Sequence, residues 1–578
     1  MADPTGGDGV VEPTAAGRLL RSLRRRGVDH VFANFGTDHT PLIEAAARLR
    51  DAGRADNLPE FVTAPHEFAA MSAAHGYAAA TGDPQAVLVH VDVGTQNLGS
   101  AVHNAHRANV PVLVVAGLAP VTHAGHQGSR DIAVHYFQDV FDQAGIVREY
   151  CRWAAEYRPP ADPTEFVARA LDRATGTDPG PVYLSATREA LETAGDWPEE
   201  GLDGTPQPVE RTAPGADTVE SLVDSIQSAS APLLVTSRLG REPEAEARVR
   251  ATVRFAETAG AGVVEHAPTV LSFPRDHELH AGFDPSAAFE HADLVLLADV
   301  DVPWIPADGG PAGDVPVLQV EADPTKRTYP QWPFAPDERY AADPARTLAA
   351  VADRLDPADG EPGRSRWSAV AADRRVAADE RVEDARSAGR LTPAVLSAAV
   401  DEVVDDRTVV VEDGVTSKAA ILEHVRLDRP GSYHAKGGAG LGWAGGAGVG
   451  VALGRPEARV VTLVGDGAYL FSHPSVCAWL AAEHDAPTLT VVYDNRGWRA
   501  VETATAAEHP QGAAVAAGVP ESHFGTELDL TAPAQAVEAV TRRVTELEAL
   551  EPALADGVAA VDDGRPAVVS VAVERPDA

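Results

Sequence analysis

The sequence has little cysteine, little lysine and no long apolar run. Only two cysteines, Cys151 and Cys477, occur in 578 residues, which excludes a disulfide framework and a cysteine-rich zinc site. No run of about 18 apolar residues is present, which argues against a membrane-spanning helix and against a membrane partner. The segment MADPTGGDGVVEPT at the start lacks a basic stretch followed by an apolar one. We therefore expect no secretory signal and a cytoplasmic location.

Positive charge is also scarce. The chain has 48 Lys and Arg against 86 Asp and Glu, a formal net charge of -38. Such a surface repels nucleic acid and anionic membranes, so we expect neither as a partner. Only three of the basic residues are lysines, Lys326, Lys418 and Lys436. A halophilic source would explain this pattern, because high salt screens the self-repulsion. A GC-rich genome would explain the missing lysines but not the acidic excess.

The length of the chain predicts several domains, because 578 residues are too many for one hydrophobic core. Strand-like apolar runs alternate with alanine-rich helical stretches in three blocks, which predicts α/β domains with parallel sheets. The expected domains lie at 1–195, 216–355 and 391–578. A Pro- and Gly-rich linker is expected at 196–215. The first and third blocks each have the pattern of a doubly wound sheet.

The most informative segment runs from 464 to 498. An apolar strand predicted at 459–464 leads into Gly465-Asp466-Gly467, and a second at 487–493 leads into Asp494-Asn495. A helix between two parallel strands would place Asp466 and Asn495 at neighbouring carboxyl ends of one sheet, where ligands bind. Carboxylate and amide oxygens suit Mg²⁺, which also uses phosphate oxygens, and glycine allows close approach of backbone to phosphate. The segment predicts a metal-bridged diphosphate site; the alternative is a plain βαβ unit with turn residues.

This pattern strongly resembles the cofactor motif of thiamine-diphosphate-dependent enzymes. The resemblance implies an α/β fold of three doubly wound parallel-sheet domains that binds thiamine diphosphate and Mg²⁺. It implies Asp466, Asn495 and the backbone carbonyl of Gly497 as metal ligands, with Gly465, Gly467 and Ala468 around the cofactor. It also implies a homodimer or a dimer of dimers, because in these families the N-terminal domain of one subunit and the C-terminal domain of its partner share each cofactor.

The catalytic carboxylate of this family has a match in Glu67. A short strand at 61–64 leads to Pro65, a favourable residue for a first helical turn, and then to His66-Glu67. The resemblance implies that Glu67 is catalytic and hydrogen-bonds N1′ of the aminopyrimidine ring of the cofactor. Apart from the resemblance, an acid at this position would merely complement the helix dipole. His66 is expected to pack or cap.

Further cofactor contacts follow from the likeness to acetolactate synthases and benzoylformate decarboxylases within the family. Leu441, in the glycine-rich segment 431–454, matches the bulky residue that holds the cofactor bent, with Trp443 as the alternative. Thr416 and Ser417 fit diphosphate ligands, and equally a helix N-cap.

The same likeness names residues for the substrate side. His90 matches a catalytic histidine and is a candidate proton donor, because its ordinary pKa is near neutrality; the alternative is a core or capping role. Gln138 is a second candidate catalytic residue, with a surface helix as the alternative. Candidate substrate-pocket residues are Thr37, His39, Phe137 and Trp498.

Three departures from the family patterns bear on the reaction. Trp304 stands near the position where benzoylformate decarboxylases carry a second catalytic histidine. The segment 497–502 departs from the pattern that acetolactate synthases have after their metal ligands. The segment 237–242 is only a weak signal for FAD, which stays a possible cofactor. The resemblance implies a small-molecule 2-oxo acid that loses carbon dioxide, after which the fragment joins a second carbonyl, as in acetolactate synthase. The alternative is protonation, as in a simple decarboxylase.

Two readings from other classes are disfavoured. A non-catalytic homologue would be expected to lack Glu67 or Asp466, and both are present. A nucleotide-binding dehydrogenase would need a G-x-G-x-x-G motif directly after a strand, with a suitably placed acid.

Overall fold

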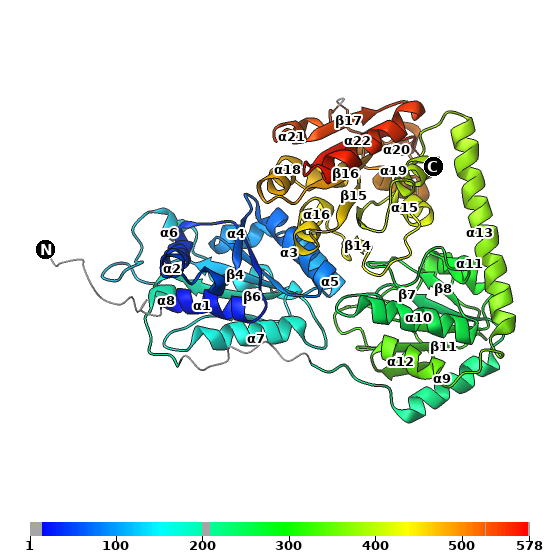
Figure 1. Ribbon diagram of the computed structural model, residues 1–578, viewed down its shortest axis with the longest axis horizontal. Helices are drawn as coiled ribbons and strands as arrows, with labels where there is room; N and C mark the ends of the chain where they lie inside the picture. Colours follow the sequence, from blue (N-terminus) through cyan, green and yellow to red (C-terminus); the bar gives the residue numbers. More distant parts are fainter. Residues whose placement is uncertain (1–13, 199–208, 526–527, 576–578) are drawn as a thin grey trace. The chain divides into compact units, whose positions relative to one another are not determined.

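Three parallel sheets of six strands each make up the computed structural model, which describes residues 14–198, 209–525 and 528–575 (Figure 1). The strand pairings within the sheets are parallel. The prediction of three α/β parts with parallel sheets is confirmed. The predicted linker and the outer ends of the first and third expected domains lie partly outside the described residues.

The first sheet has the order β2-β1-β3-β4-β6-β5. Its strands are β1 (His30–Ala33), β2 (Glu60–Thr63), β3 (Gln85–Val89), β4 (Val112–Leu118), β5 (Ala154–Glu156) and β6 (Val182–Thr187). The helices of this block are α1 (Ala15–Arg25), α2 (Thr40–Asp51), α3 (Glu67–Thr81), α4 (Val91–Asn97), α5 (Ser100–Ala108), α6 (Val134–Phe137), α7 (Pro163–Thr175) and α8 (Arg188–Glu192). The chain moves from β1 to β2 on one side and then to β3 on the other. The topological switch point, where ligands bind in open sheets, therefore lies between the ends of β1 and β3.

The second sheet has the order β12-β11-β10-β7-β8-β9. Its strands are β7 (Pro232–Thr236), β8 (Gly262–Glu265), β9 (His280–Gly282), β10 (Leu294–Ala298), β11 (Val317–Glu321) and β12 (Glu338–Ala341). The helices are α9 (Ala216–Ser228), α10 (Ala245–Ala259), α11 (Pro285–Phe289), α12 (Pro344–Ala352) and α13 (Glu361–Ser387). Its switch point lies between β7 and β10.

The third sheet has the order β14-β13-β15-β16-β18-β17. Its strands are β13 (Thr408–Asp413), β14 (Tyr433–Ala435), β15 (Arg459–Gly465), β16 (Thr488–Asp494), β17 (Val540–Val544) and β18 (Ala567–Ala572). The helices are α14 (Pro393–Asp401), α15 (Lys418–His424), α16 (Trp443–Gly454), α17 (Asp466–Phe471), α18 (Pro474–Glu483), α19 (Arg499–Glu508), α20 (Ala513–Ala516), α21 (Ala532–Gln535) and α22 (Leu550–Asp562). Its switch point lies between β13 and β15.

Short 3-10 turns complete the described chain. They are η1 (Thr37–His39), η2 (Ala55–Asn57), η3 (Ala144–Ile146), η4 (Arg148–Tyr150), η5 (Pro306–Asp308), η6 (Pro520–Ser522) and η7 (Leu547–Ala549). Over the part of the chain that is described, no helix has both the length and the apolar character needed to cross a membrane.

Local sequence explains these elements. Central strands such as β3 and β15 are buried almost throughout, and their near-continuous Val and Leu content is typical of strands covered on both faces. Helix α3 is rich in alanine, the best helix former, and ends at Gly82, which takes a φ of +82° as a C-terminal glycine commonly does. Helix α13 contributes Trp367 to the core of the second sheet and Val382 to that of the third.

The chain divides into two compact units. One is built on the first sheet and also includes Gly438–Gly450. The other holds the second and third sheets. The glycine-rich segment predicted to carry a cofactor contact thus belongs in part to the first unit.

Candidate active site

The ends of β15 and β16 carry the predicted metal ligands. Gly465 lies opposite Tyr493 in neighbouring strands, so Asp466 and Asn495 follow at the same edge of the sheet. Asp466 begins α17 and is only 2% exposed. Its Oδ2 accepts a hydrogen bond from the Gly497 amide at 3.0 Å, and its Oδ1 accepts one from the Gly467 amide at 2.7 Å. The structure therefore brings Asp466 and the loop 495–497 together.

The electrostatics of this loop suit a divalent cation. Burial raises the pKa of Asp466 to about 6, and burial also raises the pKa of the neighbouring Asp494. In the described chain no cationic side chain bonds to Asp466, and the side-chain amide of Asn495 makes no hydrogen bond. A buried carboxylate without a cationic partner is costly. Together with an amide oxygen and a carbonyl, it offers the hard oxygen ligands that Mg²⁺ prefers.

Distant residues fix the loop 495–497. Arg575 donates from Nε to the Asn495 carbonyl at 3.0 Å. The amide of Trp498 donates to the Ser522 carbonyl at 2.7 Å, and a Cβ on Gly497 would lie 2.2 Å from that same carbonyl. Gly497 is therefore needed for close backbone packing. Its carbonyl accepts one bond, from the Arg499 amide at 3.1 Å, which leaves a second lone pair for a metal.

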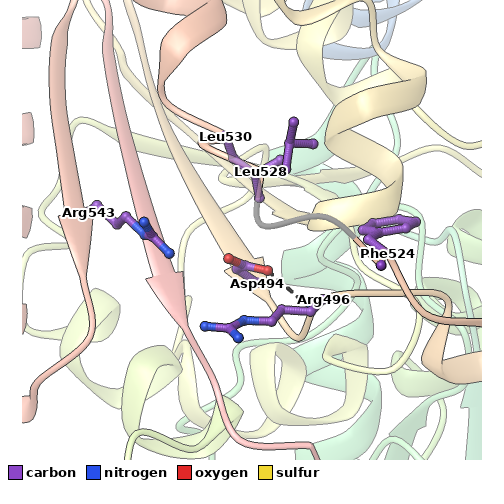
Figure 2. A pocket seen from close by; sticks show the side chains of 7 residues that line it. Asp494, Arg496, Phe524, Leu528, Leu530 and Arg543 are labelled. Atoms are coloured by element: carbon purple, nitrogen blue, oxygen red, sulfur yellow. Dashed lines mark hydrogen bonds between the residues drawn. The ribbon is translucent and has the colours of Figure 1, made fainter.

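A cavity of about 240 Å³ lies beside this loop (Figure 2). It is lined by Asp494, Arg496, Phe524, Gly525, Leu528, Leu530 and Arg543. Figure 2 shows the side chains of Asp494, Arg496 and Arg543 around this cavity. These arginines offset the negative charge of Asp494.

The predicted diphosphate ligands lie at the switch point of the third sheet. Asp413 at the end of β13 pairs with Val464, so the loop 414–417 is at the same edge as Gly465 and Ala468. Ser417 occupies the N-cap position of α15, but its hydroxyl makes no capping bond. In the described structure the hydroxyls of Thr416 and Ser417 have no hydrogen-bond partner. Both remain available to a phosphate.

The glycine-rich segment distinguishes Leu441 from Trp443. Trp443 is fully buried and donates from Nε1 to Nδ1 of His75 at 2.9 Å. Leu441 is only partly buried. It follows Gly440, whose amide and carbonyl pair with the Asn104 side chain, each at 2.9 Å. Trp443 is thus a core residue, whereas Leu441 lies at the end of an anchored loop.

Glu67 begins α3 and is 8% exposed. Its Oε2 accepts a hydrogen bond from Nδ2 of Asn97 at 2.6 Å. A Cβ on Gly94 would lie 3.2 Å from its Oε1, so Gly94 leaves space beside the carboxylate. His66 caps the helix, because its Nδ1 accepts from the Phe68 amide at 3.1 Å. The expected capping role of His66 is confirmed.

A buried aspartate joins two predicted residues at the switch point of the first sheet. His90 follows β3, and its Nδ1 lies 2.5 Å from Oδ1 of Asp38 in η1, after β1. His90 Nε2 lies 3.2 Å from Oε1 of Gln138. Asp38 also accepts from the Val91 amide at 3.2 Å. The structure thus brings His90 and Gln138 together, through an acid that sequence reasoning missed.

This arrangement favours a protonated His90. The hydrogen bond that His90 donates to Asp38 raises the pKa of His90, in spite of partial burial. Burial alone would raise the pKa of Asp38, but its hydrogen bonds with His90 and the Val91 amide, together with the charge of His90, lower it. Gln138 presents a carbonyl oxygen that can only accept, so both ring nitrogens face acceptors. The site can therefore hold a proton for transfer near neutral pH.

The remaining pocket candidates are placed differently. His39 is buried: its Nδ1 accepts from the Gly36 amide at 3.0 Å, and its Nε2 faces the Val89 carbonyl at 3.1 Å. Burial lowers its pKa, so it is a neutral, structural neighbour of Asp38. Thr37 is exposed, and Phe137 is 80% exposed. Trp498 is half-exposed beside the metal loop, with its ring edge-on to Phe524 at 5.1 Å.

The switch point of the second sheet does not fit FAD. Arg238, after β7, forms ion pairs with Asp301 and, at 3.6 Å, with Asp299, both after β10. Lys326 bonds to Asp301 at 2.9 Å and to Glu321 at 2.7 Å. Asp299 and Glu321 are buried and Asp301 is partly buried. These carboxylates occupy the edge where a flavin diphosphate would need donors. Trp304 packs edge-on against Phe289 and Phe334 within the same block.

Family models match both ends of the chain. The model for the thiamine pyrophosphate enzyme N-terminal TPP binding domain matches residues 13–146, and that for the C-terminal TPP binding domain matches residues 413–571. Together they cover just over half of the chain. They include Glu67 in one domain and Asp466 in the other.

The individual relatives share between 21% and 29% sequence identity with the chain. The chain is 25% identical to a benzoylformate decarboxylase of Pseudomonas aeruginosa over 82% of its length and 84% of the relative. It is 29% identical to an acetolactate synthase of Arthrospira platensis, over 31% of its length and 29% of the relative. Among solved structures, a thiamine diphosphate-dependent 4-hydroxybenzoylformate decarboxylase of Rhodococcus jostii matches 98% of this chain and 100% of its own, at 21% identity and a TM-score of 0.81. The last match supports the fold. The chain therefore belongs to the family of thiamine-diphosphate-dependent enzymes and carries both cofactor-binding domains of that family.

Proposed function

We propose that the protein is a thiamine-diphosphate- and Mg²⁺-dependent decarboxylase of a 2-oxo acid that ends its reaction by protonation. The observation that carries this proposal is the Asp38–His90–Gln138 arrangement, because it holds a protonated imidazole at a ligand-binding edge. Decarboxylation needs such a donor once carbon dioxide has left. The benzoylformate decarboxylase relative, which matches along most of the chain, supports the same class.

The cofactor residues take separate roles. Asp466, Asn495 and the Gly497 carbonyl would hold Mg²⁺. Gly465, Gly467, Ala468, Thr416 and Ser417 would hold the diphosphate, and Leu441 would support the rest of the cofactor. Thiamine diphosphate, when bound, supplies the electron sink that lets the carboxylate of the substrate leave. The protein supplies binding and orientation.

Glu67 would take part in the first proton transfer. It would hydrogen-bond N1′ of the aminopyrimidine, and the hydrogen bond that Asn97 donates fixes its carboxylate for this task. Glu67 is 8% exposed, which limits the access of water to it. His90 would supply its Nε2 proton to the substrate carbon after carbon dioxide has left, while Asp38 would stabilise the positive charge of the protonated ring and Gln138 would set its orientation.

Carboligation is the second candidate outcome, as in acetolactate synthases. Phe137 favours it, because this exposed ring adjoins Gln138 and offers an apolar wall to a second carbonyl compound. The acetolactate synthase relative matches less than a third of the chain, so we place this outcome after protonation.

The active form is proposed to be a homodimer or a dimer of dimers, with Glu67 of one protomer and Asp466 of its partner serving one cofactor. Support comes from an apolar strip in the first unit. Its exposed members are Ile132, Val134, Tyr136, Phe137, Val140 and Phe141. An exposed patch of this kind on a highly acidic protein marks a protein contact surface.

The test is turnover of defined 2-oxo acids. The protein is purified in high salt, supplied with thiamine diphosphate and Mg²⁺, and assayed with aromatic, basic and aliphatic 2-oxo acids for carbon dioxide, aldehydes and acyloins. We expect carbon dioxide and an aldehyde in equal amounts. Acyloin as the main product would favour carboligation, whereas bound cofactor without turnover of any acid would refute the proposal. Glu67→Gln should keep cofactor affinity and lose activity by at least about 100-fold.

A further inference from the structure

A second buried acid lies next to the loop that carries Thr416 and Ser417. Glu412 is the last residue but one of β13 and is 1% exposed. Its Oε1 accepts a hydrogen bond from the Gly414 amide, at the start of the loop. Its Oε2 lies 3.4 Å from Nζ of Lys418, directly after the loop. One carboxylate therefore ties both ends of a four-residue segment.

The Glu412 carboxylate is also fixed by a residue outside the loop. The Tyr433 hydroxyl donates to its Oε2 at 3.0 Å. Burial, and then the charge of Glu412, raise the pKa of Tyr433 well above its ordinary value, so this hydroxyl stays a donor. The Arg275 guanidinium lies over the Tyr433 ring at 4.3 Å. Arg275 also donates from Nη1 to the Val425 carbonyl at 3.0 Å, so its position is fixed.

The loop between these anchors leaves its own polar groups unused. The Thr416 and Ser417 hydroxyls have no partner in the described structure, although Ser417 is buried. A Cβ on Gly414 would lie 3.0 Å from Oε1 of Glu412 and 3.4 Å from the Lys418 amide. The backbone is thus pressed against the carboxylate. Such a segment is held in one conformation before a ligand arrives, which lowers the entropy cost of binding.

We infer that Glu412 is a positioning residue for the cofactor: it pre-forms the diphosphate loop through Gly414 and Lys418 and touches neither cofactor nor substrate. This inference rests on the proposed function. It predicts a loss of affinity for thiamine diphosphate, with the chemistry unchanged once the cofactor is bound. Glutamine at this position keeps the shape of the side chain but has only one acceptor oxygen. Its NH₂ group, which is a donor, would therefore face either the Gly414 amide or the Tyr433 hydroxyl and the Lys418 ammonium, which are donors themselves.

The experiment measures the Kd for thiamine diphosphate with Mg²⁺ by tryptophan fluorescence, and kcat at saturating cofactor. Glu412→Gln should weaken the Kd by roughly tenfold or more, because it breaks a charge-assisted hydrogen bond, and should leave kcat within about threefold of wild type. Glu423→Gln is the matched control: Glu423 lies further along α15, and the substitution removes the charge from the 2.6 Å hydrogen bond that Arg374 donates to it, so the Kd should be unchanged. Tyr433→Phe keeps the carboxylate and should weaken the Kd less, so it serves if Glu412→Gln fails to fold.

A double-mutant cycle separates positioning from general stability. In a Thr416→Ala/Ser417→Ala background the effect of Glu412→Gln on the Kd should shrink to within about threefold. An undiminished effect there, or a wild-type Kd in Glu412→Gln and Tyr433→Phe, would overturn the inference while the proposed function stands. Absence of cofactor binding by the wild-type protein would overturn the proposed function and this inference together.

Discussion

Replacing Asp38 with asparagine should uncouple His90 from its proton. Asp38 is 3% exposed and lies 2.5 Å from Nδ1 of His90. Asparagine has nearly the same shape and can still accept from the Val91 amide, but it carries no charge. Because the Asp38 hydrogen bond is the main cause of the raised pKa of His90, that pKa should fall in Asp38→Asn. The nearby charge of Asp92, which also raises the pKa of His90, remains in place.

The size of the effect follows from the kind of bond that is lost. A hydrogen bond to a charged group contributes about 1.5–3 kcal/mol, which corresponds to a loss in kcat of roughly 10- to 150-fold if His90 donates in the rate-limiting step. Complete removal of an acid–base group costs about 10²- to 10⁴-fold. His90→Gln should therefore be at least as impaired as Asp38→Asn.

The pH dependence gives the sharper test. A raised pKa keeps His90 protonated to higher pH, so the wild-type kcat should fall only when the pH rises through that value. In Asp38→Asn this basic limb should move to lower pH. Asp131→Asn is the control, because exposed Asp131 pairs with a different histidine, the buried His135, at 3.1 Å. An unshifted basic limb in Asp38→Asn, measured on kcat at saturating substrate, would refute the proposed role of the pair.

The pH dependence of thermal stability should also reveal the Asp38–His90 pair. The raised pKa of His90 gives stability that is lost as the pH rises through it, and the lowered pKa of Asp38 gives stability that is lost as the pH falls through it. The difference in Tm between wild type and Asp38→Asn should therefore be largest between these two values. It should shrink toward both extremes in a thermal melt series.

Three further predictions concern the metal, the central block and the assembly. Removal of Mg²⁺ by EDTA should abolish activity and lower the Tm of the cofactor-loaded protein, with recovery on adding Mg²⁺; Asp466→Ala should not recover, and full activity in EDTA would contradict the metal site. Lys326→Met should lower the free energy of unfolding by roughly 3–5 kcal/mol in denaturant melts. Burial raises the pKa of Glu321 to about 7, so the defect should lessen below that pH, and a pH-independent loss would contradict this account. Phe137→Ser/Phe141→Ser should shift the protein toward monomer in light scattering with loss of activity; an unchanged mass would exclude the strip as the contact surface.

The sequence alone could predict the third sheet and its loop because the signals are local. Two apolar strands at the right separation imply adjacent carboxyl ends, and Asp466 and Asn495 follow those strands directly. The residues that fix the loop could not be found in this way. Arg575 and Ser522 are far away in sequence and follow no recognisable motif, and their contacts arise only when β18 and the segment before β17 pack against β16.

Asp38 is a second site residue that the sequence alone could not identify. In GTDHT it looks like an ordinary turn residue, and its partner His90 lies 52 positions away. One signal was available: both residues follow strands that flank the expected switch point. From the sequence alone, Leu441 and Trp443 are alternatives, because both are bulky and apolar. Only tertiary packing, with Trp443 buried against His75, separates a core side chain from one at a loop end.

The three sheets show that side chains, and not topology, decide what each switch point does. The first sheet places the Asp38–His90 pair there, and the third places Gly414 at the same sheet edge as Asp466. The second has the strand order 3-2-1-4-5-6 in its own numbering, the order of many dinucleotide-binding sheets. Yet Arg238, Asp301 and Lys326 close that edge with ion pairs. The strand order of a dinucleotide-binding sheet therefore does not by itself establish a bound dinucleotide, which is why a function must be argued from the site.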